Sequence, residues 1–461
     1  MTEDREFSVR GKRVTVAGAA RSGIAAAELL VRRGADVTVS DLRDHIDEEN
    51  QLRDAGVSLE LGGHKPETFM NADLVVLSPG VPNAHPAIDA ARRAGVTVVG
   101  ELELASRWLR GRIVAITGTK GKSTTTTLTG RMLEAGGFKV LVGGNIGHAL
   151  SAQVDQSTDD TIHVVETSSF QLESIDTFHP WVAVLLNFSP DHLDRHASVA
   201  EYAAAKARIF ANQTAADWAV LNADDAATLQ LASRSSSQRV LFSMEQDLRD
   251  GFVIEGGAIV RRSPAGDQRL VPLTSIKLIG RHLLADVLAA CAIAQLAGVD
   301  AAAMTRAIEG FTGLEHALEP VGEIGGVQFV NDSKATNIEA ARRAIEAFET
   351  GLVVIMGGRF KGGDFRDLER PLAERHATVV AIGEARPRIH EAFANRVSVL
   401  DAEDMRTAVR KAFAAAPPGG SVVLAPACSS FDMFRDYAER GRVFKQEMRR
   451  LESEWNTTRE Q

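Results

Sequence analysis

Short apolar runs recur along the chain, and most end in glycine or small polar residues before a stretch with helical spacing. Near-continuous apolar strands that alternate with helices are typical of parallel sheets covered on both faces. The pattern therefore predicts an α/β fold built from three groups of strands. The runs lie at residues 13–17, 37–41 and 74–77 in the first group, at 113–116, 140–142, 163–165 and 182–186 in the second, and at 352–356, 378–382 and 422–425 in the third.

One segment breaks this alternation. Residues 239–273 contain shorter runs separated by Gly-Gly and Pro-Ala-Gly turns, which favour a small antiparallel sheet beside the parallel one. At 461 residues the chain is long enough for three domains of about 150 residues each. We expect a Rossmann-like domain over residues 1–100, a central domain over residues 101–312 and a second Rossmann-like domain over residues 313–461.

Composition narrows the classes of function. The formal net charge of −9 argues against a large nucleic-acid interface. Two cysteines, Cys291 and Cys428, are too few for a disulfide scaffold, which fits a reducing, cytoplasmic setting. Residues 1–10 are polar, unlike a secretory signal, and no apolar run reaches the roughly 18 residues of a membrane span. We therefore expect small-molecule ligands, and neither nucleic acid nor a membrane, as partners.

The segment from Gly118 to Thr124 reads Gly-Thr-Lys-Gly-Lys-Ser-Thr and follows the strand that ends at Ile116. A strand, a glycine-rich bend and a helix start form a phosphate cradle, because backbone N–H groups and the helix dipole face an anion there. Lys122 would reach the β- and γ-phosphates, and the Ser123 hydroxyl would bind Mg²⁺. The loop is a short variant, since Ile116 stands where the standard Walker pattern has glycine. A glycine turn with a chance lysine is the alternative.

A second glycine-rich bend, Gly18 to Gly23, follows the first strand and resembles a dinucleotide fingerprint. Ala20 replaces the glycine that lets a pyrophosphate approach the backbone, so a nicotinamide cofactor is not favoured. Asp41 ends the next strand, where a ribose-binding carboxylate would lie. The sequence predicts a nucleotide site of some kind; the alternative is a tight strand–helix turn with Asp41 as a solvated loop residue.

Carboxylates and imidazoles follow two strands of the central group. Glu166 ends one strand, just ahead of Ser168, and residues 187–196 after the next strand include Asp191 and His192. Oxygen ligands at the carboxyl end of a sheet that also carries a phosphate loop indicate Mg²⁺. Helix capping is the alternative for both segments. The usual zinc-ligand spacing is not present in the second one.

Three polar loops follow apolar strands in the last part of the chain, at residues 331–337, 357–365 and 426–434. The first packs polar and small residues into one row, and the second combines glycines with two cations. We interpret them as ligand loops, with anion binding at the second; flexible, exposed turns are the alternative. Cys428 has no histidine nearby in sequence, so we interpret it as a packing residue.

Together these segments resemble the Mur ligase family over nearly the whole chain. The motifs that carry the resemblance are Gly118–Thr124, Glu166–Leu172, Asp191–Arg195, Lys206, Asn331–Asn337 and Pro426–Phe434. The resemblance implies a UDP-binding first domain, a central P-loop ATPase domain and a Rossmann-like third domain. It also implies the ATP-dependent addition of glutamate to UDP-N-acetylmuramoyl-L-alanine in peptidoglycan synthesis, through an acyl phosphate, by a monomeric chain.

The resemblance further implies roles for individual residues. The catalytic set would be Lys122, Lys206, His192, Asn145 and Lys334. ATP would contact Gly118, Thr119, Lys120, Gly121, Lys122, Ser123, Thr124, Asp286, Asp332 and Lys334. The UDP-substrate would contact Gly18, Ala20, Arg21, Ser22, Asp41, Arg43, Ser78, Pro79, Gly80, Asn145 and Ser168, and glutamate would contact Thr336, Lys361, Ser430, Phe431 and Tyr437. Two Mg²⁺ ions would be held by Ser123, Glu166, His192 and Lys206, the last after carbamylation by CO₂.

The chain departs from the family's pattern at several of these positions. Lys120 stands where asparagine is usual, and Leu42 where threonine is common. The family's His-Asn-x-x-Asn segment reads His-Leu-Leu-Ala-Asp at residues 282–286, and Ala317 follows His316 where arginine is usual. These positions leave the adenine, ribose and uracil contacts open, as well as the stereochemistry of the glutamate.

Three other functions are compatible with parts of the pattern. A folylpolyglutamate-type ligase would share the central phosphate loop but would not need the UDP-type first domain. A nicotinamide-dependent oxidoreductase would be built on residues 18–41 and would leave Lys122 and Glu166 without a role. A non-catalytic ATP-binding module would leave the metal-binding groups without one.

Overall fold

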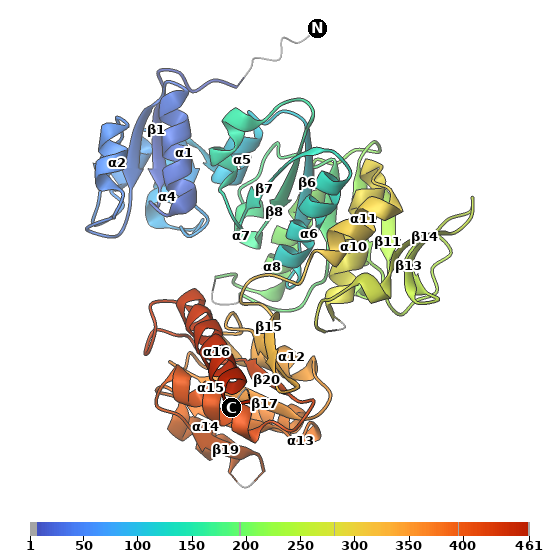
Figure 1. The fold of residues 1–461 in the computed structure, drawn as a ribbon. Coiled ribbons are helices and arrows are strands. Elements are labelled where there is room, and N and C mark those ends of the chain that lie inside the picture. Colours follow the sequence, from blue (N-terminus) through green and yellow to red (C-terminus); the bar gives the residue numbers. More distant parts are fainter. Residues whose placement is uncertain (1–6, 193–194, 281, 395, 460–461) are drawn as a thin grey trace. The chain divides into compact units, whose positions relative to one another are not determined.

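The computed structural model describes residues 7–192, 195–280, 282–394 and 396–459. Leu193 and Asp194, within the Asp191–Arg195 motif, lie outside the described residues. The chain forms two compact units, one made of Met1–Ser275 with Ala285–Ile308 and the other of Ile276–Leu284 with Glu309–Gln461. The first unit contains two sheets and the second contains one (Figure 1).

The N-terminal sheet has five parallel strands in the order β3-β2-β1-β4-β5. Its strand order reverses between β1 and β4, and ligands of such folds bind at that switch point, beyond the carboxyl ends of the strands. The strands are β1 (Arg13–Ala17), β2 (Asp36–Ser40), β3 (Ser58–Glu60), β4 (Leu74–Leu77) and β5 (Thr97–Gly100). The helices are α1 (Arg21–Arg32), α2 (Glu49–Asp54), α3 (Pro66–Met70), α4 (Pro86–Arg93) and α5 (Glu101–Ser106).

The central sheet has nine strands in the order β14-β13-β12-β11-β10-β9-β6-β8-β7. Its parallel strands are β6 (Arg112–Thr117), β7 (Lys139–Gly144), β8 (Thr161–Glu166), β9 (Val182–Leu185), β10 (Trp218–Asn222) and β11 (Gln238–Phe242). The helices are α6 (Lys122–Ala135), α7 (Ser169–Leu172), α8 (Val199–Ala207), α9 (Ala226–Leu231), α10 (His282–Ala297) and α11 (Ala301–Glu309).

The antiparallel strands predicted over residues 239–273 are present, but they do not form a sheet of their own. They are β12 (Gly251–Glu255), β13 (Ala258–Arg262) and β14 (Gln268–Pro272). The parallel pair Phe242–Phe252 joins β12 to β11, so the hairpins extend the nine-stranded sheet. The segment also begins one strand later than expected, because residues 238–242 belong to the parallel part.

The second unit has a six-stranded sheet in the order β15-β16-β20-β17-β18-β19, parallel except for the edge strand β15. Its strands are β15 (Glu319–Ile324), β16 (Val327–Asn331), β17 (Leu352–Gly357), β18 (Thr378–Ile382), β19 (Ser398–Asp401) and β20 (Ser421–Leu424). Its helices are α12 (Ile338–Glu346), α13 (Glu369–Glu374), α14 (Arg386–Phe393), α15 (Met405–Ala415) and α16 (Tyr437–Arg459).

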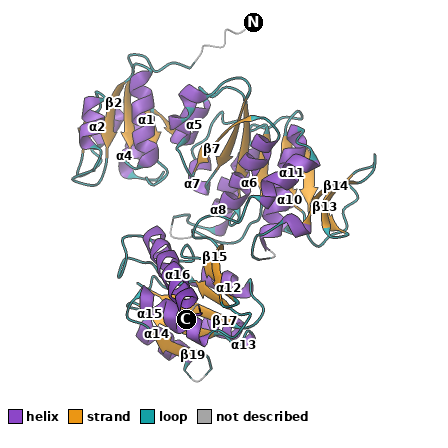
Figure 2. Ribbon diagram, viewed as in Figure 1, coloured by secondary structure: helices purple, strands orange, loops and turns teal. Residues whose placement is uncertain are grey.

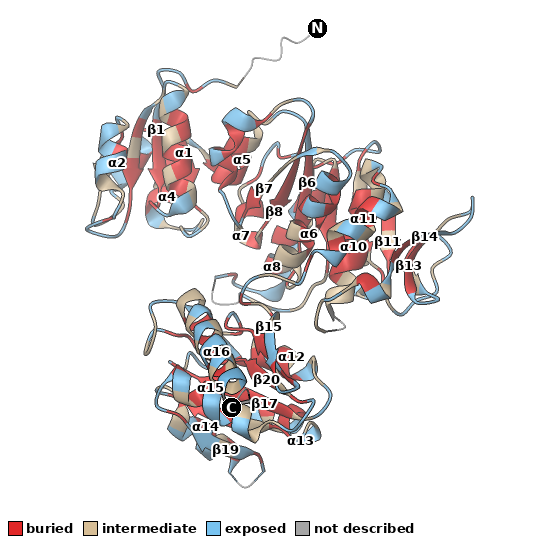
Figure 3. Ribbon diagram, viewed as in Figure 1, coloured by how far each residue is buried: buried red, intermediate tan, exposed pale blue. Residues whose placement is uncertain are grey.

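Helices flank the strands of each sheet (Figure 2), and the strands are the most buried elements (Figure 3). Side chains that alternate along a strand enter separate cores on the two faces of the sheet. In β17, for example, Val354 and Met356 join one core, while Val353 and Ile355 join the other. This two-sided burial explains the near-continuous apolar runs. Within the described ranges, every helix is too short or too polar to cross a membrane.

Candidate active site

The glycine bend between β6 and α6 has the geometry of an anion cradle. Gly118 and Gly121 have φ angles of 159° and 83°, which side chains rarely allow. Gly121 is the N-cap of α6 and supplies no side-chain cap, which suits a helix start that binds an anion. Lys122 begins the helix, and its Nζ donates to the carbonyl oxygens of Gly118 (2.9 Å) and Thr119 (3.1 Å). The predicted phosphate-binding residues therefore share one turn.

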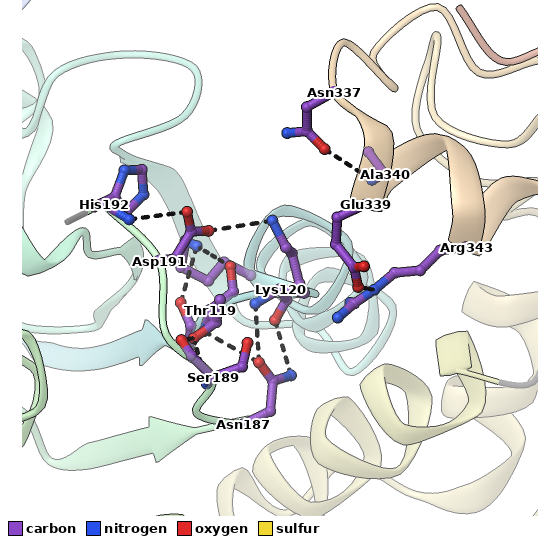
Figure 4. A network of polar contacts seen from close by, with 12 residues as sticks. Thr119, Lys120, Asn187, Ser189, Asp191, His192, Asn337, Glu339, Ala340 and Arg343 are labelled. Carbon is purple, nitrogen blue, oxygen red and sulfur yellow. Dashed lines mark hydrogen bonds and ion pairs between the residues drawn. The ribbon is translucent and has the colours of Figure 1, made fainter. Parts of the chain in front are cut away.

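The loop after β9 fixes the shape of this bend (Figure 4). Asn187 Oδ1 accepts hydrogen bonds from the N–H groups of Thr119 and Lys120, and Asn187 Nδ2 donates to Lys120 O. The Thr119 hydroxyl donates to Ser189 O at 3.0 Å. Lys120 Nζ lies 3.3 Å from a carboxylate oxygen of Asp191. The phosphate bend and the predicted metal loop are thus one network, and no pattern in the sequence indicates that Asn187 is its centre.

Glu166 is a buried carboxylate at the end of β8, with 2% of its surface exposed. Asn145 Nδ2 donates to Glu166 Oε1 at 2.7 Å, whereas Oε2 has no hydrogen-bond partner among the described residues. A buried carboxylate oxygen without a donor requires a compensating charge, so the side chain fits a bound cation such as Mg²⁺. Ser168 is the N-cap of α7 and forms a capping box with Gln171. The helix-capping alternative therefore describes Ser168 and not Glu166.

Lys206, on α8, is almost fully buried, at 1% exposure. Its Nζ donates to Gly118 O at 2.8 Å and lies 4.8 Å from the centre of the Tyr202 ring. Burial and the nearby charge of Lys122 lower the pKa of Lys206 to about 6, although Glu166 acts in the opposite direction. A lysine with this pKa is mostly a neutral amine at pH 7, and a neutral amine is a nucleophile.

Two further predicted residues, His192 and Asp286, come from other elements. His192 follows β9 with a φ of 54°, and its ring packs edge-on against Phe170 at 5.2 Å. Asp286 lies on α10 against the phosphate bend, because a Cβ on Gly121 would be only 2.1 Å from Asp286 Oδ1. Burial raises the pKa of Asp286 well above its usual value, and the charge of Lys122 opposes this shift. This shift favours the protonated acid, which has a hydroxyl donor as well as a carbonyl acceptor.

In the N-terminal sheet, the predicted UDP site is built on the switch point between β1 and β4. The backbones of the two loops are close, since a Cβ on Gly18 would lie 3.1 Å from Ser78 Cβ. Asp41, which is 7% exposed, accepts a hydrogen bond from Ala19 N at 2.6 Å. Burial raises the pKa of Asp41, but the hydrogen bonds from Arg43 and Ala19 outweigh it and lower the pKa to about 2. Asp41 is therefore a buried anion that fixes the glycine bend, not a solvated loop residue.

The rest of this predicted site lies on the same loops. Ala20 is the N-cap of α1 and offers no side-chain cap, and the first-turn residues Arg21 and Ser22 follow it directly. After β4, Gly80 O accepts a hydrogen bond from Arg195 Nη1 at 3.2 Å. This bond ties the predicted UDP-binding loop, which includes Pro79, to the metal loop of the central sheet.

The second unit brings its three predicted ligand loops together, since Arg359 N donates to Ser429 O and Ser429 N donates to Arg359 O, both at 3.0 Å. Ala427 N donates to Ala335 O at 2.9 Å, which joins residues 332–336 to residues 426–434. Arg440, which is 1% exposed, donates to Ser333 Oγ (3.0 Å), Ser333 O (2.9 Å) and Cys428 O (3.0 Å). The sequence did not single out Arg440, because one arginine in a charged helix carries no signal of burial. Burial also raises the pKa of Cys428 to about 12, which agrees with its interpretation as a packing residue.

The predicted glutamate- and ATP-binding side chains of this unit lie on these three loops, except Tyr437, which begins α16. Burial raises the pKa of Asp332 to about 7, against the hydrogen bond from Leu318 N and the charge of Lys334. Lys361 Nζ lies 5.9 Å from the centre of the Phe431 ring, which is 59% exposed. The remaining members are Thr336, which is half-buried, Ser430, which is buried, and Tyr437, which is exposed at the start of α16.

Parallel sheets, a glycine bend at a helix start and a buried lysine beside a buried carboxylate define a nucleotide-binding α/β protein of the P-loop class. Three family models match successive parts of the chain. They are the Mur ligase MurD-like N-terminal domain at residues 12–100, the Mur ligase middle domain at residues 116–294 and the Mur ligase glutamate ligase domain at residues 318–428. The chain belongs to the Mur ligase family.

Known relatives and solved structures agree with this assignment. A UDP-N-acetylmuramoylalanine–D-glutamate ligase of Acidobacterium capsulatum is 48% identical over 95% of this chain and 96% of its own length. A ligase of the same name from Koribacter versatilis is 44% identical over 96% of this chain and 99% of its own. Among solved structures, a Thermotoga maritima UDP-N-acetylmuramate–alanine ligase matches with a TM-score of 0.58 at 19% identity, covering 95% of this chain and 99% of that one. That likeness supports the three-domain α/β fold.

Proposed function

We propose that this protein is an ATP-dependent ligase that adds D-glutamate to UDP-N-acetylmuramoyl-L-alanine in cytoplasmic peptidoglycan synthesis. The observation that carries the proposal is the 48% identity, over 95% of the chain, to a relative named for that reaction. The MurD-like match at residues 12–100 speaks against a folylpolyglutamate-type ligase, which would not need this domain. Family membership speaks against a nicotinamide-dependent oxidoreductase.

The reaction must first activate a carboxylate, which is a poor electrophile. An oxygen of the alanyl carboxylate attacks the γ-phosphorus of ATP, the bond to the β-phosphate oxygen breaks, and ADP leaves. The amine of glutamate then attacks the acyl carbon, loses a proton, and phosphate leaves with the electrons of the acyl C–O bond. The phosphate bend would place hydrogen-bond donors next to the phosphoryl oxygens, where negative charge develops. These donors are Lys122 and the N–H groups of the first turn of α6.

Two Mg²⁺ ions belong to this proposal. Glu166, with its buried Oε2, fits such an ion, and Ser123 and His192 would supply further ligands. Bound Mg²⁺ would neutralise charge on the phosphoryl oxygens. We also propose that Lys206 is carbamylated. The pKa of about 6 supports this, because CO₂ reacts with the neutral amine. The carbamate would turn a buried cation into an anion that holds the second Mg²⁺.

The other binding assignments stay proposals with local support. For the UDP-substrate, the support is that the loops at Gly18 and Ser78 lie close together. Asn145 follows β7 and Ser168 caps α7, so both would contact the substrate from the central part of the chain. For glutamate, it is the paired loops at residues 332–336 and 426–434, with Lys361 on the third loop. The domain limits at residues 100 and 312 are also proposals. The match to the N-terminal domain ends at residue 100, and the match to the glutamate ligase domain begins at residue 318, which supports both limits. A monomeric state remains a prediction.

Phosphate release measured with ATP, Mg²⁺ and UDP-N-acetylmuramoyl-L-alanine tests the proposal when D-glutamate, L-glutamate and other amino acids are supplied in parallel. We expect release that depends on D-glutamate and an amide product of matching mass. Glu166→Gln should abolish release, and the exposed control Glu134→Gln, on α6, should retain it. Equal release without any amino acid, or a preference for L-glutamate, would refute the assignment.

A further inference from the structure

His196 lies in a cluster of aromatic rings next to the predicted active site. Its ring stacks on Phe170, with centroids 5.3 Å apart and planes inclined by 15°, and the centroid of the Tyr202 ring lies 5.2 Å from its own. Its Nε2 lies 3.0 Å from Ser169 Oγ, and its side chain is 0% exposed. These contacts fix the orientation of the ring and therefore the direction of its other nitrogen, Nδ1.

Nδ1 of this buried ring faces a carboxylate. It lies 3.1 Å from Glu173 Oε1, yet it makes no hydrogen bond with any residue in the described ranges. Burial lowers the pKa of His196, which favours the neutral form of the ring. When Nε2–H is donated to Ser169, Nδ1 carries a lone pair. A lone pair and a carboxylate oxygen at this distance repel each other, and a cation bound by both would relieve the repulsion.

A second carboxylate completes the cluster. One ligand atom each from Glu173, His196 and Glu201 lie within 4.8 Å of one another. Burial and the charge of Glu201 raise the pKa of Glu173, which means that the two carboxylates repel each other in the absence of a cation. Glu201 is exposed in the first turn of α8, and its Oε2 accepts a hydrogen bond from Ala197 N at 2.8 Å. Its other oxygen, Oε1, is therefore the candidate ligand.

The cluster borders a cavity of about 470 Å³ that Glu173 and Glu201 help to line. Water from this cavity can complete a coordination sphere. Three arginines, Arg92, Arg195 and Arg208, line the same cavity and weaken its attraction for cations. However, each has a partner outside the cluster. Arg92 pairs with Asp89, Arg208 donates to Leu172 O and Ile175 O, and the Arg195 guanidinium stacks 4.6 Å above the Phe170 ring.

We propose that Glu173, His196 and Glu201 form a binding site for one divalent transition-metal ion of the Zn²⁺ or Co²⁺ type, distinct from the predicted Mg²⁺ sites. One imidazole nitrogen, two carboxylate oxygens and water form a donor set that suits these ions, whereas Mg²⁺ prefers oxygen alone. The ion would link the end of α7 to the start of α8. It would thus stabilise the two segments that carry Ser168 and Lys206.

The site can be tested by metal binding alone, without the ligase reaction. The full-length protein is stripped of metal with a chelator, transferred to buffer with excess Mg²⁺, and titrated with Co²⁺ while visible absorption is recorded. We expect one saturable equivalent of Co²⁺ with a ligand-field band, which Zn²⁺ displaces. His196→Gln and Glu173→Gln should each weaken binding at least tenfold, because each removes a direct ligand.

Three further variants make the outcome decisive. His179→Gln is the matched control, since His179 pairs with Asp217 at 2.7 Å outside the cluster and should keep the band. Glu201→Gln changes an exposed ligand without disturbing the core, so it decides the matter if His196→Gln fails to fold by circular dichroism. A band that survives Glu201→Gln and Glu173→Gln, or the absence of any saturable band, would overturn the proposal. Loss of the band in Glu166→Gln alone would also overturn it by placing the ion at the predicted Mg²⁺ site.

Discussion

The burial of Lys206 makes a quantitative prediction. Its pKa is lowered from 10.5 to about 6, chiefly by burial. At pH 7.5 a pKa of about 6 leaves about 97% of the amine unprotonated, whereas the usual value would leave about 0.1%. Lys206 should therefore present about 10³-fold more free amine to CO₂ than an exposed lysine. We expect a carbamate signal in carbon-13 NMR with labelled bicarbonate that is lost in Lys206→Met and kept in the exposed control Lys139→Met.

The same shift predicts how stability depends on pH. In CO₂-free buffer the unfolded chain binds a proton at Lys206 that the folded chain releases, over the range between the two pKa values. The stability associated with this group is fully present above pH 10.5 and is lost progressively as the pH falls towards about 6. At pH 7 the free energy of unfolding is lowered by at most about 5 kcal/mol. This limit follows from the 3.5 pH units between pH 7 and the usual pKa of 10.5, at about 1.36 kcal/mol each.

Urea unfolding at pH 7 and pH 9 measures this cost. Lys206→Met should be more stable than the unaltered protein at pH 7 by about 2–5 kcal/mol. The gain should shrink at pH 9, while Lys139→Met changes little at either pH. Turnover should be lost in Lys206→Met and partly restored by short carboxylic acids that replace the carbamate. Equal pH dependence in variant and unaltered protein, or undiminished turnover, would refute the reasoning.

Three other substitutions probe the site. Lys122→Ala should lower turnover by about 10²–10³-fold, the scale for one charge stabiliser, as measured by phosphate release; retained activity would contradict its role. Asp286→Asn should leave ATP affinity nearly unchanged, because the amide matches the carboxyl group in shape and because burial, which raises the pKa of Asp286, favours its uncharged form; calorimetric titration checks this, and a clear loss of affinity would contradict it. Arg440→Met should lower the free energy of unfolding by about 2–4 kcal/mol, because the buried carbonyls of Ser333 and Cys428 lose their hydrogen-bond donor. It should also raise the KM for glutamate. An unchanged midpoint of unfolding would contradict this prediction.

Much of the fold could be predicted because parallel strands buried on both faces leave continuous apolar runs. The first strand was predicted at residues 13–17 and occurs as Arg13–Ala17, and the phosphate bend lies between a strand and a helix as expected. The placement of β12–β14 could not be predicted. Local turns specify that hairpins form, but the strand they join is decided by tertiary contacts, here the single pair Phe242–Phe252.

The site was predictable where its chemistry is local in sequence and not where it depends on distant contacts. Glu166 could be placed at a strand end from the pattern alone. Lys206 reads as a surface lysine, because the alanines around it give no amphipathic signal, and only the family resemblance singled it out. Asn187 and Arg440 act on residues 67 and 107 positions away, a separation that no single-sequence pattern encodes.

The claim that carries the account is that the terminal phosphoryl group of ATP passes to the alanyl carboxylate of a UDP-linked substrate. UDP-N-acetylmuramoyl-L-alanine labelled with oxygen-18 in that carboxylate tests it directly when the phosphate released during ligation is analysed by mass spectrometry. The account predicts phosphate that has gained an oxygen-18 atom from the substrate. Unlabelled phosphate, formed at the same rate as the amide, would contradict it.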